Sequence, residues 1–182
     1  MKDIDEPARR PARSCSWRWT RAAVIDWVAL ALAVGLCGVM AGAESMLSGR
    51  DLPAWLNSLE RPRFFAPFSV WVLVAILTYA LQGAIAYRLL QLPRSGLDIA
   101  ALAALLAVMS ANVAYNVVLD RTRDPLWAYR GLVLFLPVLA VLQVLLLLAD
   151  PISGGLHLVY VAWVVGYDLP IMRAIARLNS RK

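Results

Sequence analysis

Five long apolar stretches, each almost free of charged residues, constrain the fold of this chain more than any other feature. A helix needs about 20 apolar residues to cross the hydrocarbon core of a bilayer. The chain is 61% hydrophobic and 16% charged, whereas a soluble domain is about a quarter charged. The sequence therefore predicts an all-α membrane protein, a bundle of five transmembrane helices. The expected spans are 22–40, 68–92, 97–119, 126–149 and 152–175.

A single membrane domain, residues 22–179, is expected to account for most of the chain. A basic tail (1–21) precedes it and a short basic end (180–182) follows it. The tail is too polar and too rich in arginine for a cleavable signal peptide, so we expect the first span to be retained. Positive residues are divided almost equally between the two ends of the spans, so the positive-inside bias predicts no orientation.

The formal charge of +6 raises the question of nucleic acid as a partner. The basic residues, however, lie at the ends of apolar stretches, where they anchor helices to anionic headgroups. No soluble module with a basic face is present in the sequence. We therefore expect a lipid bilayer, and no nucleic acid, as the surroundings of this chain.

The one long connection, residues 41–67, contains a short amphipathic segment. Asp51 is a suitable N-cap, and Pro53 is tolerated in a first helical turn. The apolar positions after it recur with the spacing of one helix face: Leu52, Trp55, Leu56 and Leu59. Two interpretations fit this pattern, a helix lying on the membrane surface and a lid over the mouth of the bundle.

Polar side chains within the spans are costly in lipid and are expected to face the interior of the bundle. Asn112 and Asn116 are four residues apart, so they share one face of the third span. The other polar or aromatic residues of this kind are Gln82, Tyr115, Gln143, Tyr160, Trp163, Tyr167 and Asp168. They are interpreted either as groups that hold helices together or as the wall of a pocket for a large, flat, mostly apolar ligand.

Asp168 is the most suggestive single residue of the spans. Pro170 removes a backbone donor just after it and is expected to kink the helix. Asp168 is expected to pair with Arg173 or Arg130, or to lie near the membrane interface. A role in binding a ligand or a proton is the alternative.

Other reactive side chains are few. His157 is expected to be a solvated or helix-capping residue beside a helix start. Cys15 and Cys37 are not expected to pair, and no metal-ligand spacing exists in the sequence. We find no nucleophile with a base and no glycine-rich phosphate loop, so the motifs give no support to an enzyme.

Small residues form rows along the third span: Gly96, Ala100, Ala103, Ala104, Ala107 and Ala111. Such rows let two helices approach closely in a membrane. They are centred away from Asn112 and Asn116, so one helix can serve two contacts. We expect a homodimer through the third span.

Several short motifs follow one another along the chain. Residues 61–67 read RPRFFAP, and residues 78–87 read TYALQGAIAY, with Tyr79, Gly83 and Tyr87 at intervals of four. Residues 110–115 read SANVAY. In order and spacing these motifs resemble the TspO/MBR family, which contains the tryptophan-rich sensory proteins of bacteria and the mitochondrial translocator protein. The resemblance covers about residues 22–179 and implies five helices with a long first loop.

The resemblance also implies a ligand. Family members bind tetrapyrroles such as porphyrin or haem, and some bind sterols; no permanent cofactor is implied. Phe64 and Tyr115 stand at tryptophan positions of the family, and Trp71 is expected to replace a tryptophan that is Ala75 here. The residues expected to contact the ligand are Pro62, Phe64, Trp71, Tyr79, Gly83, Asn112, Tyr115, Asn116, Trp127, Tyr160, Trp163 and Asp168.

The expected function is therefore that of a multi-pass protein of a bacterial cell membrane that senses, carries or regulates tetrapyrroles or similar flat hydrophobic molecules. One alternative is a small proton-coupled transporter or permease that uses Asp168. A second is a membrane enzyme acting on an isoprenoid or a pigment. A third is a structural subunit that binds no ligand.

Overall fold

The computed structural model describes residues 25–47, 49 and 52–179. Within these residues, five helical segments are long and apolar enough to cross a membrane. This confirms the predicted architecture, and the chain is an integral multi-pass membrane protein. Four spans are single helices: α1 (Trp27–Leu47), α3 (Phe68–Leu90), α4 (Gly96–Thr122) and α5 (Pro125–Ala149). The fifth comprises α6 (Pro151–Trp163), the π-helical turn η1 (Val164–Asp168) and α7 (Leu169–Asn179).

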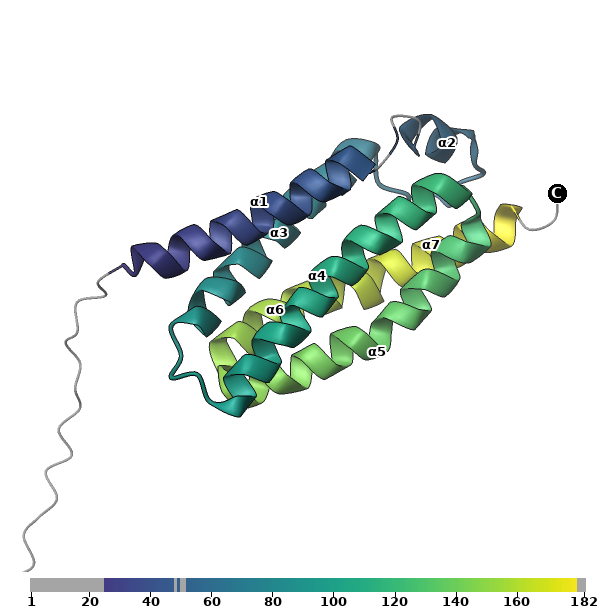
Figure 1. The fold of residues 1–182 in the computed structure, drawn as a ribbon. Helices are drawn as coiled ribbons and strands as arrows, with labels where there is room; N and C mark the ends of the chain where they lie inside the picture. Colours follow the sequence, from purple (N-terminus) through teal and green to yellow (C-terminus); the bar gives the residue numbers. More distant parts are fainter. Residues whose placement is uncertain (1–24, 48, 50–51, 180–182) are drawn as a thin grey trace, which may run out of the picture.

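The five spans are arranged as a ring (Figure 1). α1 packs against α3 and α4, α3 against α6, and α5 against α4, α6 and α7. Short connections make neighbouring spans antiparallel. Side chains that point inward from the spans therefore meet at the centre of the ring.

The helix ends follow local sequence signals. Ser95 and Asp98 form a reciprocal capping box at the start of α4, with Asp98 N–H donating to Ser95 Oγ over 3.2 Å. Asp124 caps α5 and Asp150 caps α6, and each of these helices has proline in its first turn. These caps explain why the predicted starts of the last three spans lie within one residue of the observed ones.

The first span differs from its prediction. The observed α1 continues to Leu47, whereas hydropathy placed its end at Met40. The extra residues carry Glu44, a charge that terminates a hydropathy window, but the side chain has partners inside the bundle. The long connection is accordingly shorter than residues 41–67, and Asp51, its expected cap, lies outside the described residues.

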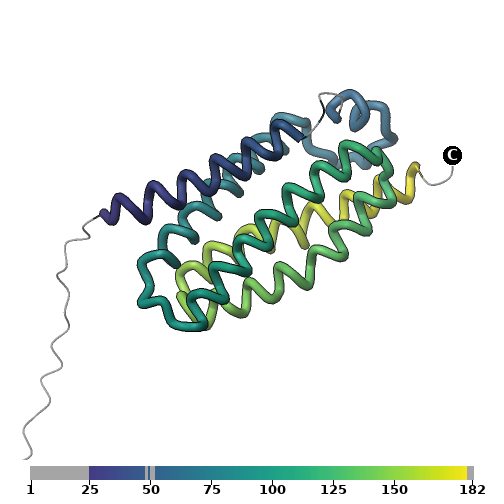
Figure 2. Tube along the Cα trace, in the orientation of Figure 1, coloured from purple at the N-terminus to yellow at the C-terminus, as the bar shows by residue number. Residues whose placement is uncertain are grey.

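The connection forms the short helix α2 (Leu52–Ser58), which lies at the end of the bundle where α1 ends and α7 finishes (Figure 2). Its predicted apolar face is confirmed, because Leu56 is buried while Leu52, Trp55 and Leu59 pack against the core. This helix therefore covers the end of the bundle. Before it, Gly49 N–H donates to Asp120 Oδ2 of α4 over 2.5 Å.

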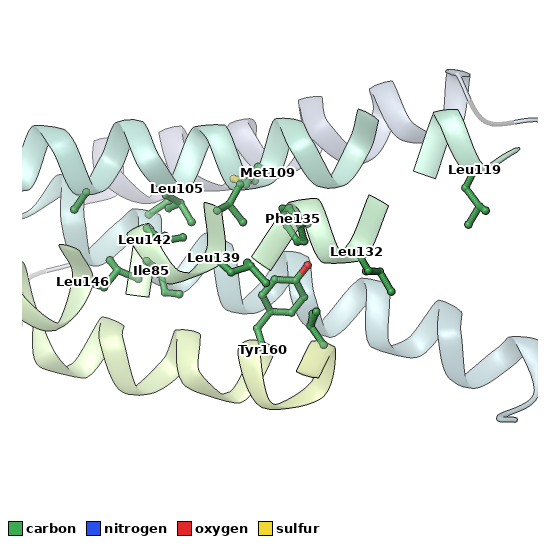
Figure 3. Close-up of a cluster of buried hydrophobic side chains, with 14 of the residues drawn as sticks. Ile85, Leu105, Met109, Leu119, Leu132, Phe135, Leu139, Leu142, Leu146 and Tyr160 are labelled. Carbon is green, nitrogen blue, oxygen red and sulfur yellow. The ribbon is translucent and has the colours of Figure 1, made fainter. Parts of the chain in front are cut away.

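The core lies mainly between α4, α5 and the span that follows (Figure 3). Its members come from every third or fourth residue of α5, as in Leu132, Phe135, Leu139, Leu142 and Leu146. This spacing places one face of α5 inside and leaves the remaining apolar residues outside, toward lipid.

The predicted kink in the fifth span is a π-helical turn. Residues Val164–Asp168 adopt this geometry just before Pro170. Because proline has no backbone N–H, the helix loses one ladder hydrogen bond there, and a wider turn accommodates the loss. The turn changes the faces on which Trp163, Tyr167 and Asp168 emerge. Such turns are frequent at functional sites.

Candidate functional site: an interior polar cluster and an aromatic row

Glu44 of α1 holds together three spans. Tyr79 of α3 donates its hydroxyl to Glu44 Oε2 over 2.5 Å, and Asn116 of α4 donates its amide to Glu44 Oε1 over 2.7 Å. Each carboxylate oxygen thus has its own donor. Hydrogen bonds to an ionised acceptor are the stronger kind.

A second pair continues this network toward the fifth span. Tyr160 of α6 is buried and donates its hydroxyl to Asn112 Oδ1 over 3.3 Å. Asn112 lies one turn before Asn116 on the same face of α4, which connects this pair with Glu44 and Tyr79. We call these five residues, Glu44, Tyr79, Asn112, Asn116 and Tyr160, the interior polar cluster. The sequence predicted that Asn112, Asn116 and Tyr160 face the bundle interior, and it gave Tyr79 as an expected ligand contact.

The interior polar cluster is not tightly closed by its neighbours. Tyr79, Asn112 and Asn116 are only half-buried, although their partners come from two other spans, α1 and the fifth. Side chains in a packed core are normally buried almost completely. These three side chains therefore remain partly accessible.

Asp168, at the end of the π-helical turn, faces the same interior. Its Oδ1 atom is buried and has no hydrogen-bond partner in the described part of the chain. Trp163 lies beside the same carboxyl group. A buried polar atom without a partner is costly and marks a place where water or a ligand is expected.

The expected ion pair of Asp168 is not formed, since the described residues contain no salt bridge from it to Arg173 or Arg130. The π-helical turn explains this correction: it directs Asp168 inward. Arg173 and Arg130 are both exposed instead.

A continuous aromatic row runs from loop one to the fifth span. The ring centroids of Phe65 and Trp71 are 5.8 Å apart, those of Trp71 and Tyr167 also 5.8 Å, and those of Tyr167 and Trp163 4.6 Å. These separations are typical of favourable aromatic contacts. Trp71 therefore contacts the aromatic surface of the fifth span, as expected of a replacement for the tryptophan missing at Ala75.

The aromatic row also fastens the last part of loop one. The Tyr167 hydroxyl accepts from Ala66 N–H over 2.7 Å and donates to Phe64 O over 2.9 Å. The Trp71 indole donates to Ala66 O over 3.2 Å. Further along, Asn179 of α7 exchanges hydrogen bonds with the backbone of Glu60. Loop one is thus held against the mouth of the bundle from two sides.

Gly83 serves helix packing. A Cβ atom at this position would lie 3.1 Å from the Cys37 sulfur of α1, so glycine permits the close approach of α1 and α3. Cys37 donates its thiol to Tyr79 O over 3.4 Å across the same contact. Gly83 therefore acts on the site by positioning Tyr79 against α1.

The remaining predicted site residues lie apart from the interior polar cluster. Phe64 is 83% exposed and contributes only its backbone carbonyl. Trp127 is 51% exposed and lines a cavity of about 280 Å³ between α4 and α5, together with Tyr115, whose hydroxyl donates to Ala128 O. Pro62 lines a separate and larger groove beside α7.

His157 contradicts its prediction as a solvated or capping residue. It is fully buried, and its Nδ1 lies 2.9 Å from Gln143 Oε1. Gln143 in turn donates to Gly154 O over 3.0 Å. Gly154 brings α6 so close to α5 that a Cβ there would meet Leu147, and this close approach encloses the histidine. Here the alternative interpretation of the amides, as groups that hold helices together, is correct for Gln143.

Three important residues had no role in the sequence analysis: Glu44, Arg88 and Asp150. Glu44 was placed in a loop, although a lone acid one turn beyond an apolar stretch was a usable signal. Arg88 and Asp150 form a bidentate salt bridge with distances of 2.7 and 2.9 Å. The sequence places Arg88 near the end of one span and Asp150 at the start of another, but it does not show that the two side chains meet.

Comparison with known proteins agrees with the motifs. The family model described as TspO/MBR family matches residues 27–167, from the start of α1 into η1. This is well over half of the chain and includes the interior polar cluster and the aromatic row. No curated protein matches the chain.

Proposed function

The chain belongs to the TspO/MBR family, and from that premise we propose that it binds tetrapyrroles, such as porphyrin or haem, or similar flat hydrophobic molecules, and senses, carries or regulates them. The observation that supports this function most is that the same bundle holds both the aromatic row, with Trp163 beside the Asp168 carboxyl group, and the interior polar cluster. Aromatic faces suit a flat ring system, and a few amides and hydroxyls suit its polar edges.

In this proposal the aromatic surface of Trp163 carries the ligand ring. Trp163 lies 4.6 Å from Tyr167 and beside Asp168, so a bound ring meets both stacking surface and a polar group. Asn112 and Asn116 orient the polar edges of the ligand. α2 and the aromatic end of loop one close the mouth.

A titration with protoporphyrin tests the proposal. Binding is followed by porphyrin absorbance, because removing a tryptophan changes the protein fluorescence. Trp163→Ala is expected to weaken binding about tenfold or more, since aromatic contacts and buried area are both lost. Trp127→Ala is the matched control, because Trp127 is exposed on the outside of α4 and α5. Equal affinity of the wild type and both folded variants would overturn the proposed site.

A second candidate function, a proton-coupled transporter, is favoured by Asp168. A carboxyl group inside a span with a buried oxygen that lacks a partner is suited to gain and lose a proton. Asp168→Asn preserves the shape and removes the ionisable group. Flux that is driven by a pH gradient in proteoliposomes and lost in this variant would favour transport, whereas retained porphyrin binding without flux would favour sensing.

We further propose that the chain forms a homodimer through α4. Four small residues of this helix are exposed at helical spacing: Gly96, Ala100, Ala103 and Ala107. Ala104 and Ala111, which belong to the same rows, instead pack against the core. The exposed face therefore consists of side chains that allow another helix to approach closely.

A further inference from the structure

A basic groove, larger than the cavity between α4 and α5, lies outside the interior polar cluster. Its volume is about 670 Å³, and it lies where the end of loop one, the first turns of α5 and one face of α7 meet. Four arginines line it: Arg61, Arg63, Arg173 and Arg177. Its volume is in the range of small-molecule sites, about 300–1,000 Å³.

The lining combines positive charge with apolar surface. No acidic residue is among the described residues that line the groove, while Leu169 and Leu178 contribute apolar surface. Arg61 is held in place by Asn57, 3.1 Å away, and by the ring of Phe65, 5.4 Å from the guanidinium carbon to the ring centroid. A molecule that fits this lining has an anionic head and an apolar body.

Two of the arginines carry the inference. Arg177 already interacts with another group. Arg63 and Arg173, by contrast, form no salt bridge with any described residue. Positive charges that share a cavity repel one another, and an anion between them removes that repulsion.

The position of the groove indicates which anion meets it. Ile171, Met172, Ile175 and Ala176 form the buried face of α7, so Arg173 and Arg177 emerge on the opposite face, away from the core. α7 is also the last part of the fifth span, beside the charged end of loop one (Figure 1). The groove therefore opens to the side, at the level where lipid headgroups meet the hydrocarbon.

We propose that this groove is a binding site for an anionic phospholipid. Arg63 and Arg173 bind the headgroup phosphate, because the planar guanidinium group matches phosphate oxygens with two parallel hydrogen bonds. Arg61 adds positive charge, and the first carbons of the acyl chains lie on Leu169 and Leu178. The groove shares no side chain with the interior polar cluster, and it adjoins the aromatic row through the contact of Arg61 with Phe65.

Binding of a fluorescent phosphatidylglycerol to the purified full chain in mild detergent tests this site. The double variant Arg63→Gln and Arg173→Gln is expected to weaken binding about tenfold or more. The matched control is Arg121→Gln with Arg130→Gln, which removes the same charge at the same end of the bundle from exposed positions outside the groove. The control is expected to change affinity by less than about twofold, because separated surface charges are screened by salt.

Competition identifies the part of the ligand that is recognised. Unlabelled phosphatidylglycerol is expected to compete, and phosphatidylcholine, oleate and inorganic phosphate to compete poorly. If phosphatidylcholine competes equally well, the groove recognises apolar surface only. If oleate competes best, the site recognises a carboxylate, and if phosphate competes as well as the lipid, it recognises any small anion. Each of these results overturns the proposal. An equal loss in both double variants overturns it too, by showing diffuse charge attraction. If the double variant does not fold, Arg63→Gln alone, an exposed loop change, must still weaken binding measurably, and unchanged affinity overturns the proposal.

Discussion

At the end of the bundle where the connections are short, Arg88 of α3 is tied to Asp150 at the junction of α5 and α6, and Asp150 also accepts from Ser153. Ser153 and His157 behind this group are fully buried. At the loop-one end, Tyr79, Asn116 and Trp71 are half-buried, and Asp168 keeps a buried oxygen without a partner. The same five spans are thus closed at one end and incompletely packed at the other.

Because the two ends of the bundle are packed differently, we expect one end to determine stability and the other to determine ligand binding. The buried side chains and the bonds among Arg88, Asp150 and Ser153 hold the spans in register at the closed end. The other end can therefore leave polar groups available to a ligand at a cost in local stability. A change at the closed end should therefore lower stability and spare ligand affinity. A change at the open end should do the reverse.

The largest effect is expected from Asp150→Ala at the closed end. This variant leaves Arg88 without its carboxylate and removes the cap of α6, so we expect a loss of about 2–3 kcal/mol of stability. Breaking a fully buried ion pair costs about 3–5 kcal/mol of stability. We expect a smaller loss here, because the Arg88 side chain is 36% exposed and its charge is partly screened by solvent. Denaturant unfolding in detergent measures the loss. Porphyrin affinity, measured below the unfolding transition, should change less than twofold, and a loss of affinity as large as that of Trp163→Ala would contradict the separation.

Acid should weaken the same end. The Arg88 guanidinium and the Ser153 donors lower the pKa of Asp150 below its ordinary value. A carboxyl group with a lowered pKa in the folded state contributes its stability above the unfolded pKa of about 3.9, and that contribution is lost as pH falls further. Between pH 6 and pH 3 the wild type should lose about 1–2 kcal/mol more stability than Asp150→Asn. Parallel losses in the two proteins would show that other carboxyl groups govern the acid response.

The exposed small residues lie on the half of α4 that belongs to the closed end. Ala103→Leu with Ala107→Leu should push paired helices apart and weaken dimerisation about tenfold, measured by sedimentation or by subunit exchange in nanodiscs. The matched control is Val144→Leu on α5, an equally exposed apolar position outside the small-residue face. A wild type that is monomeric in both mild detergent and nanodiscs would show that the chain does not dimerise through α4.

The closed and open ends also differ in how far the sequence predicted them. Hydropathy, helix caps and prolines were sufficient to predict the five spans, apart from the end of the first, because each of these signals is local in the sequence. The interior face with Asn112, Asn116 and Tyr160 followed from helical spacing. Glu44 was missed because a hydropathy window ends at a charge, whereas its partners Tyr79 and Asn116 are distant in sequence and make the charge acceptable in the bundle.

Tertiary features decide the surroundings of both His157 and Asp168. His157 is enclosed because Gly154 lets two helices approach closely, and Asp168 turns inward because a π-helical turn changes the helix face. Neither the interhelical distance nor the extra residue in a turn is specified by the residues next to them. The solvated position expected for His157 was therefore wrong, and of the alternatives for Asp168 the structure shows the inward direction and not the ion pair.

The smallest effect is expected from Tyr167→Phe, which loosens the lid at the open end. The variant keeps the ring beside Trp71 and Trp163, and loses the hydroxyl that holds Ala66 N–H and Phe64 O. With one fastening removed, loop one should open more often, so porphyrin dissociation should become about threefold faster while association changes little. Stopped-flow measurement of both rates checks this, with Tyr87→Phe, a half-buried tyrosine near the closed end, as the matched control. Slower association with unchanged dissociation would show that loop one guides entry of the ligand instead of retaining it. Equal effects of the two variants on the rates would show that the Tyr167 hydroxyl has no special part in closing the site.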